Sequence, residues 1–191
     1  MQEIRIIEKQ VLAERRSKLE LIRFEKEQNG KTEIHEKEVF YRPAAACILL
    51  YDPDRQTVIL LKQFRLPVFL MDKRPDLLFE ACAGLLDEGE LPEHAIIREA
   101  EEETGYRISE IEKIAEGYSS PAAFSEYVHF YIGKYSPELK VNQGGGLANE
   151  GESIEIIELS ADEAKRKLLT GQIRDVKTLV LLQHALLKKL I

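Results

Sequence analysis

Three glutamates close together in the chain have the types and the spacing to bind a cation. Glu99, Glu102 and Glu103 stand at relative positions i, i+3 and i+4, so a helix would place their carboxylates on one face. Like charges at these spacings disfavour a helix by about 0.2–0.5 kcal/mol per pair. A divalent cation held by oxygen ligands would turn this repulsion into coordination, and Mg²⁺ or Mn²⁺ suits carboxylates.

The helix that must carry these glutamates has recognisable ends. Pro92 suits a first helical position, and Gly105 suits the residue just past the end. The sequence therefore predicts a helix from about Pro92 to Thr104. The three glutamates lie in its last turns, where the helix dipole favours positive side chains instead. An acidic helix facing solvent would explain the charge run alone equally well.

The wider segment from Gly84 to Tyr106 decides between these readings, because it resembles the Nudix box of the Nudix hydrolases. Ala100 and Tyr106 fill its apolar positions. The resemblance implies an enzyme that cleaves a diphosphate joining a nucleoside to another group, with water and a divalent metal. The fixed residues of the box are present at their places: Gly84, Glu90, Arg98, Glu99, Glu102, Glu103 and Gly105.

The box divides into metal ligands and supporting residues. Glu99 and Glu103 are predicted to bind the metal directly, and Glu102 to support or contact a second ion. The resemblance adds the main-chain carbonyl of Ala83, and Gly84 would let that backbone approach closely. Mg²⁺ is the predicted cofactor, with Mn²⁺ as a substitute.

Other acidic residues receive different predictions. By resemblance, Glu90 and Arg98 form a charge pair that holds the loop against the helix. Glu101 is predicted to face solvent. In a loop after three glycines, Glu150 or Glu152 is predicted to complete the metal cluster or deprotonate water, with Glu152 favoured over Glu150; an ordinary hairpin loop is the alternative.

Beyond the box, segments along nearly the whole chain resemble the branch of Nudix hydrolases that cleaves GDP-mannose. By that resemblance, Arg65 clamps a phosphate, Glu126 touches the diphosphate region and Lys177 reaches the sugar nucleotide. Lys37 and Glu38 resemble base or ribose contacts. Hydrolysis of ADP-ribose to AMP and ribose 5-phosphate is the alternative reaction, and a non-catalytic nucleotide-sugar sensor is the alternative class. The matching segments are KEVFYR, LLKQFR, FEACAGLLD, SSPAAFSEYVHFYI, NQGGGLANEGESIEIIEL and GQIRDVKT.

Composition narrows the class of protein. A net charge of −7 argues against nucleic acid as a partner. No apolar run reaches the 18 or more residues of a membrane span, and the N-terminus lacks a signal-peptide core, so we expect a cytoplasmic protein. Cys47 and Cys82 lie in apolar runs without CxxC spacing and are predicted to be reduced core residues.

The order of the elements predicts a mixed α+β sandwich of the Nudix type. Residues 1–42 are predicted to form an antiparallel three-stranded meander, and residues 43–191 the Nudix domain. Two strongly apolar segments, AAACILLYD and TVILLKQFR, are predicted to form a buried hairpin. In the resembling branch the N-terminal strands exchange between two subunits. A homodimer is therefore predicted, since such a meander cannot bury its apolar face alone.

Overall fold

The structure, a computed structural model, describes residues 3–146 and 153–191. The chain divides into two units, one formed by residues 1–44 and 117–128, and the other by residues 45–116 and 129–191. Among the described residues, every helix is too short or too polar to cross a lipid bilayer.

The first unit is built around an antiparallel meander, as the sequence predicts. Its strands are β1 (Glu3–Glu14), β2 (Lys18–Gln28) and β3 (Lys31–Tyr41), in the order β1-β2-β3. Asn29 and Gly30 join β2 to β3 with φ angles of 55° and 72°. Positive φ at both positions suits a tight hairpin turn, which explains the preference for Asn-Gly.

The second unit contains a sheet whose main strand order is β10-β5-β4-β9-β8, with β6 paired to β5 and β7 paired to β4. Every residue of β4 is buried, which is typical of a strand covered on both faces. The strands are β4 (Ala45–Asp52), β5 (Thr57–Gln63), β6 (Leu78–Glu80), β7 (Cys82–Leu85), β8 (Ile111–Tyr118), β9 (Tyr127–Lys134) and β10 (Ile154–Ser160).

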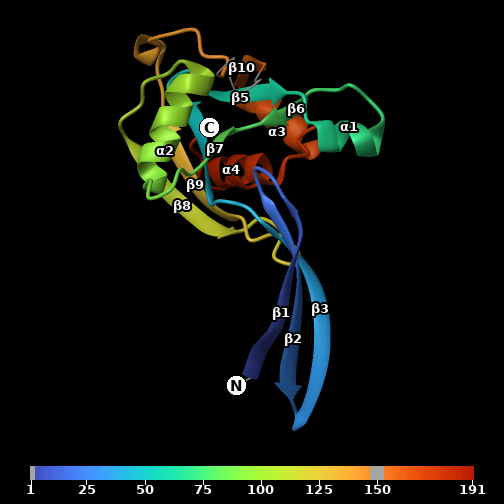
Figure 1. The fold of residues 1–191 in the computed structure, drawn as a ribbon. Coiled ribbons are helices and arrows are strands. Elements are labelled where there is room, and N and C mark those ends of the chain that lie inside the picture. Colours follow the sequence, from blue (N-terminus) through green and yellow to red (C-terminus); the bar gives the residue numbers. More distant parts are fainter. Residues whose placement is uncertain (1–2, 147–152) are drawn as a thin grey trace. The chain divides into compact units, whose positions relative to one another are not determined.

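Helices cover both faces of this sheet (Figure 1). On one face, α2 (Pro92–Glu99) packs Ile96 against Ile48 and Leu50 of β4 in a single apolar cluster. Because side chains alternate along a strand, the intervening residues of β4 point to the other face. There α4 (Val176–Leu187) packs against β4 and β6, and α3 (Ala161–Leu169) packs against α4 and β10. The mixed α+β sandwich predicted from the sequence is confirmed.

Two short helices were not predicted from the sequence. The helix α1 (Leu66–Asp72) follows β5 directly, has Pro67 in its first turn and ends at Lys73 in a left-handed conformation. Six of its seven residues are apolar and none is buried, so the segment lacks the contrast between an apolar and a polar face by which a helix is recognised in a sequence. The short 3₁₀ helix η2 (Pro137–Leu139) was not predicted either. Cys47 and Cys82 are buried and free, as predicted.

Candidate active site

The predicted acidic helix is present, but its last turn differs from the prediction. After α2 the chain continues as the π-helix η1 (Ala100–Thr104) and ends at Gly105 with a φ of 79°. The hydroxyl of Thr104 donates to the carbonyl of Ala100. Bonds in a π-helix run from i to i+5, and such wide turns are frequent at functional sites. Periodicity of 3.6 residues gave the right helix bounds but could not reveal this change of winding.

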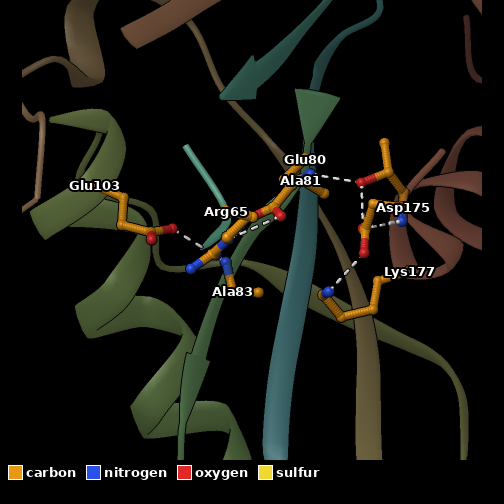
Figure 2. Close-up of polar contacts among 8 residues, drawn as sticks. Arg65, Glu80, Ala81, Ala83, Glu103, Asp175 and Lys177 are labelled. Carbon is orange, nitrogen blue, oxygen red and sulfur yellow. Dashed lines mark hydrogen bonds and ion pairs between the residues drawn. The ribbon is translucent and has the colours of Figure 1, made fainter. Parts of the chain in front are cut away.

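Glu103 points from the π-helix toward strand β7. Its side chain is buried, with 4% of the residue exposed, and Oε2 accepts a hydrogen bond of 3.0 Å from the backbone N–H of Ala83 (Figure 2). A carboxylate is seldom buried in this way unless it is paired or holds a metal. The contact puts Glu103 beside the residue whose carbonyl the family resemblance assigns to the metal.

Glu99 lies against the next residue of the same strand. A β-carbon built on Gly84 would stand 2.1 Å from Oε1 of Glu99, well inside any allowed contact. Gly84 therefore provides a cradle for this carboxylate. Glu99 and Glu103 thus meet two successive residues of β7 from one end of the same helix.

Arg98 draws three carboxylates together. Its Nε lies 3.2 Å from Oε1 of Glu90, and its Nη2 lies 3.2 Å from Oε2. These contacts form the predicted pair between the loop and the helix. Its Nη1 donates to Glu99 at 2.9 Å and to Glu102 at 3.1 Å, which was not predicted. The hydrogen bonds to Glu90 and the charge of Glu99 outweigh burial and raise the pKa of Arg98 above its ordinary value.

Two further acidic residues of the box, Glu93 and Glu101, have partners as well. Glu101, which the sequence predicts to face solvent, forms a two-pronged pair with the exposed Arg107, with both distances 2.9 Å. Glu93 accepts a hydrogen bond of 2.8 Å from the hydroxyl of Tyr131. Both contacts depend on residues outside the box, so the box itself carries no signal of them.

Within the described residues, no group of three or more His, Cys, Asp or Glu side chains is arranged to hold a metal ion. The reason is visible at each side chain, because Arg98 binds Glu99 and Glu102 while Glu103 accepts from Ala83. The donor set nevertheless fits a hard divalent cation, since all its donors are oxygens and the Gly84 cradle brings a carboxylate onto the strand.

Two predicted substrate-binding cations lie in the same unit as the box. Arg65, just before α1, pairs with Glu80, and Lys177, in the first turn of α4, pairs with Asp175 (Figure 2). The sequence prediction missed both partners. Asp175 carried a readable signal, because an aspartate directly before a helix is a preferred cap. Glu80 carried none.

The other predicted substrate residues belong to the first unit. Glu126 forms an ion pair of 3.4 Å with Nε of Arg42. Lys37 and Glu38 lie on β3 opposite Ile22 and Leu21 of β2. Glu38 also lines a cavity of about 310 Å³, whose other lining residues are Leu19, Phe40, Ala123 and Phe124.

The loop that contains Gly144, Gly145 and Gly146, here called the glycine loop, contacts the acidic helix directly. Gly145 N–H donates to the carbonyl of Glu103 at 2.9 Å, and Gly146 N–H donates to the carbonyl of Glu102 at 3.2 Å. These bonds satisfy carbonyls that a helix end leaves without partners. Residues 147–152, which include the predicted Glu150 and Glu152, lie outside the described residues.

Comparison with known proteins identifies the class to which this fold and site belong. Residues 40–180 match the NUDIX domain family, so the chain belongs to the Nudix hydrolases, as the box predicts. It is 41% identical over 184 residues to the GDP-mannose pyrophosphatase of Citrobacter koseri, covering 96% of this chain and 95% of the relative. It is 39% identical over 191 residues to the GDP-mannose pyrophosphatase of Shigella dysenteriae serotype 1, covering 100% and 98% respectively.

Proposed function

We propose that this chain hydrolyses the diphosphate of a nucleoside diphosphate sugar, with GDP-mannose as substrate and GMP and mannose 1-phosphate as products. The observation that carries the diphosphate chemistry is the meeting of Glu99 and Glu103 with Ala83 and Gly84 on strand β7. The choice of GDP-mannose is supported by relatives of that name, which align with nearly the whole chain.

The proposed metal ligands are Glu99, Glu103 and the carbonyl of Ala83, with Glu102 contacting a second ion. Mg²⁺, or Mn²⁺ in its place, would neutralise the diphosphate and acidify a water molecule there. Without a metal, Nη1 of Arg98 donates to Glu99 at 2.9 Å and to Glu102 at 3.1 Å, and so holds these two carboxylates near each other. An arginine in this role limits the repulsion between the carboxylates.

The proposed substrate contacts are the residues that the sequence predicts for this role. Arg65 clamps a phosphate, Glu126 contacts the diphosphate region and Lys177 reaches the sugar nucleotide. Lys37 and Glu38 bind the base or the ribose. Glu152 from the glycine loop is the proposed general base and completes the metal site, because the loop's glycines are bonded to the carbonyls of the helix that carries the other ligands. The proposed role of Glu152 does not depend on which sugar the substrate carries.

A substrate panel tests the proposed reaction. The purified protein is incubated with Mg²⁺ and GDP-mannose, ADP-ribose, UDP-glucose or GDP alone, and the products are separated by ion exchange. We expect GMP and mannose 1-phosphate with the highest kcat/KM of the panel. A preference for ADP-ribose would replace the proposed substrate, and tight binding of GDP-mannose without turnover would favour a sensor. Metal chelation should abolish turnover, and Mg²⁺ should restore it.

We further propose that the chain works as a homodimer in which residues 1–42 exchange between subunits and Lys37 completes the partner's site. Every residue of the edge strand β1 is exposed. An unpaired edge with apolar side chains favours association with a second chain. The exposed apolar residues of this strand are Ile4, Ile6, Ile7, Val11 and Leu12.

Sedimentation equilibrium tests the dimer. We expect twice the chain mass of 21.9 kDa for the natural sequence, and a monomer for Ile6→Lys/Val11→Lys. Exchange has its own test, in which Lys37→Ala and Glu103→Gln proteins are unfolded together and refolded. Mixed dimers should regain one complete site, so activity should exceed the sum of the two refolded separately. A monomeric natural protein would contradict the proposal.

A further inference from the structure

A buried carboxylate holds Arg65 in one orientation. The guanidinium forms a two-pronged pair with Glu80, with Nε 2.9 Å from Oε1 and Nη2 2.6 Å from Oε2. The side chain of Glu80 is 8% exposed, whereas that of Arg65 is 43% exposed. A guanidinium has five N–H donors in a fixed fork. The pair engages Nε and Nη2, which leaves the donors on Nη1 for an anion.

A second carboxylate, largely but not fully buried, holds Lys177 in a similar manner. Oδ1 of Asp175 accepts from Nζ of Lys177 at 2.7 Å, and the side chain of Asp175 is 10% exposed. Oδ2 accepts from the backbone N–H of Thr178 at 2.9 Å and from its hydroxyl at 2.7 Å. Asp175 therefore caps α4 and fixes Lys177 with its two oxygens.

Hydrogen bonds connect this cap to the strand that bears the catalytic site. Thr178 is fully buried, and its Oγ1 accepts from the N–H of Ala81 at 2.7 Å. Two residues further along, the N–H of Ala83 donates to Glu103. Figure 2 shows these contacts in one view, with Arg65 between Glu103 and Glu80. The start of α4 and the acidic helix are thus fastened to the same short stretch of backbone.

The charges alternate in sign around this stretch. Burial opposes the charge of Arg65, but its hydrogen bonds with Glu80 and the negative charges of Glu80, Glu103 and Asp175 raise its pKa above the ordinary value. Burial likewise opposes the charge of Lys177, and Asp175 and Glu80 raise its pKa. Each cation is affected by both carboxylates, so the four groups form one electrostatic unit.

We propose that Glu80 and Asp175 are positioning residues, which hold Arg65 and Lys177 as a preformed two-cation site for the diphosphate of the substrate. This inference rests on the proposed function. The Nη1 donors that Glu80 leaves on Arg65 and the ammonium of Lys177 can each donate to oxygens of a diphosphate. Both are long, flexible side chains, and fixing them beforehand removes an entropic cost that binding would otherwise carry. Without the carboxylates, the two cations would also repel each other.

Asp175→Asn tests the proposal at Lys177. Asparagine keeps an oxygen for the N–H of Thr178 but presents no negative charge to the ammonium. We expect the KM for GDP-mannose to rise about tenfold while kcat changes less than about threefold, as for a loss of uniform binding. Asp175→Asn/Lys177→Ala should be no weaker than Lys177→Ala alone, because the aspartate acts through the lysine. Likewise, Glu80→Gln should raise the KM, and Glu80→Gln/Arg65→Ala should be no weaker than Arg65→Ala alone.

A second measurement keeps this test separate from the choice of substrate. Calorimetric titration with inorganic pyrophosphate and Mg²⁺ measures anion binding in the same proteins without any turnover. We expect each single variant to weaken pyrophosphate binding about tenfold. Glu158→Gln is the matched control, because Glu158 forms a comparable two-pronged pair with Arg55 away from this network.

The outcomes distinguish the two hypotheses. Failure of the natural protein to cleave nucleotide sugars would overturn the proposed function, while weakened pyrophosphate binding in the variants would still support the positioning role. Unchanged KM and pyrophosphate affinity in Asp175→Asn and Glu80→Gln would overturn the positioning role. So would strictly additive losses in the double variants, since a merely structural carboxylate would act independently of its cation.

Discussion

A β-carbon on Gly84 would lie 2.1 Å from Oε1 of Glu99, and its next nearest neighbours would also be atoms of the Glu99 side chain. The glycine and the glutamate are fifteen positions apart in the chain, on β7 and at the end of α2. Their contact means that the bare backbone at Gly84 defines where the Glu99 carboxylate can lie. A glycine at the head of the Nudix box is thus explained by a side chain at its other end.

Gly84→Ala should therefore damage activity more than stability. The methyl group would push the flexible Glu99 side chain away, and a displaced ligand can cost about 100-fold in rate. The free energy of unfolding should fall by about 1 kcal/mol or less, which corresponds to about 2–4 °C in Tm. Kinetics and thermal unfolding check this. Gly117→Ala is the control, because a β-carbon there meets nothing within 4 Å; equal activity of the two variants would contradict the cradle.

Glu103→Gln should remove most turnover and leave the fold intact. Glutamine can still accept the N–H of Ala83 through its carbonyl oxygen, but it is a poor ligand for a hard cation. Loss of metal stabilisation worth several kcal/mol would lower kcat by at least about 100-fold. Steady-state kinetics and Mg²⁺ titration calorimetry provide the measurement. Glu101→Gln, which alters a residue paired outward with Arg107, should keep nearly full activity. Near-normal kcat in Glu103→Gln would refute its role as a ligand.

The glycine loop gives a third prediction, because Gly144 touches backbone and not a mobile side chain. A β-carbon there would stand 2.6 Å from the carbonyl carbon of Thr104 and 2.7 Å from the carbonyl oxygen of Glu103. Gly144→Ala should therefore lift the loop from the helix end and cost about 1–3 kcal/mol by overpacking. The φ of +64° at Gly144 adds backbone strain. Gly171→Ala is the control for this strain, because Gly171 has a φ of +71° and a β-carbon there would meet nothing within 4 Å. Urea unfolding should show a larger loss at Gly144, and equal losses would attribute the effect to φ alone.

How much of this site could be predicted from the sequence depends on how far apart its parts lie in the chain. Glu90 and Arg98 are eight residues apart, and the residues that mark the ends of the acidic helix, Pro92 and Gly105, are thirteen apart, so spacing alone reveals them. The bond from Ala81 to Thr178 spans 97 residues. It exists because α4 packs against β4 and β6, which brings Thr178 to Ala81 between β6 and β7, and no local pattern encodes that packing.

The same limit explains the changed roles of single residues. Arg98 was predicted as a brace for Glu90 alone, since a pair is all that a motif specifies. Its contacts with Glu99 and Glu102 follow from helix winding, and the π turn that follows could not be read from a period of 3.6 residues. The spacing of the charges therefore predicted that the carboxylates lie close together. It did not predict that the guanidinium of Arg98 holds Glu99 and Glu102 there.

The bond from Tyr131 to Glu93 gives a prediction on stability and pH. The hydroxyl hydrogen bond lowers the pKa of Glu93 below 4.5. Because the folded pKa is lowered, this contribution is present above about pH 4.5 and is lost as the pH falls through the folded value. Burial, and then Glu93, raise the pKa of Tyr131 above 10.0. That contribution is present below about pH 10 and is lost as the pH rises.

Tyr131→Phe should therefore lower the free energy of unfolding at pH 7 by about 1.5–3 kcal/mol, as for a hydrogen bond to a charged group. The difference from the natural protein should narrow as the pH falls below about 4.5, where Glu93 of the unfolded chain takes up a proton more readily than Glu93 of the folded chain, and again above pH 10, where the tyrosine of the unfolded chain ionises. Urea unfolding at pH 3.5, 7 and 10.5 measures this. Tyr118→Phe, at an exposed tyrosine, should show a small and constant difference. A difference for Tyr131→Phe that stays constant across these pH values would mean that the loss arises from packing and not from the bond to Glu93.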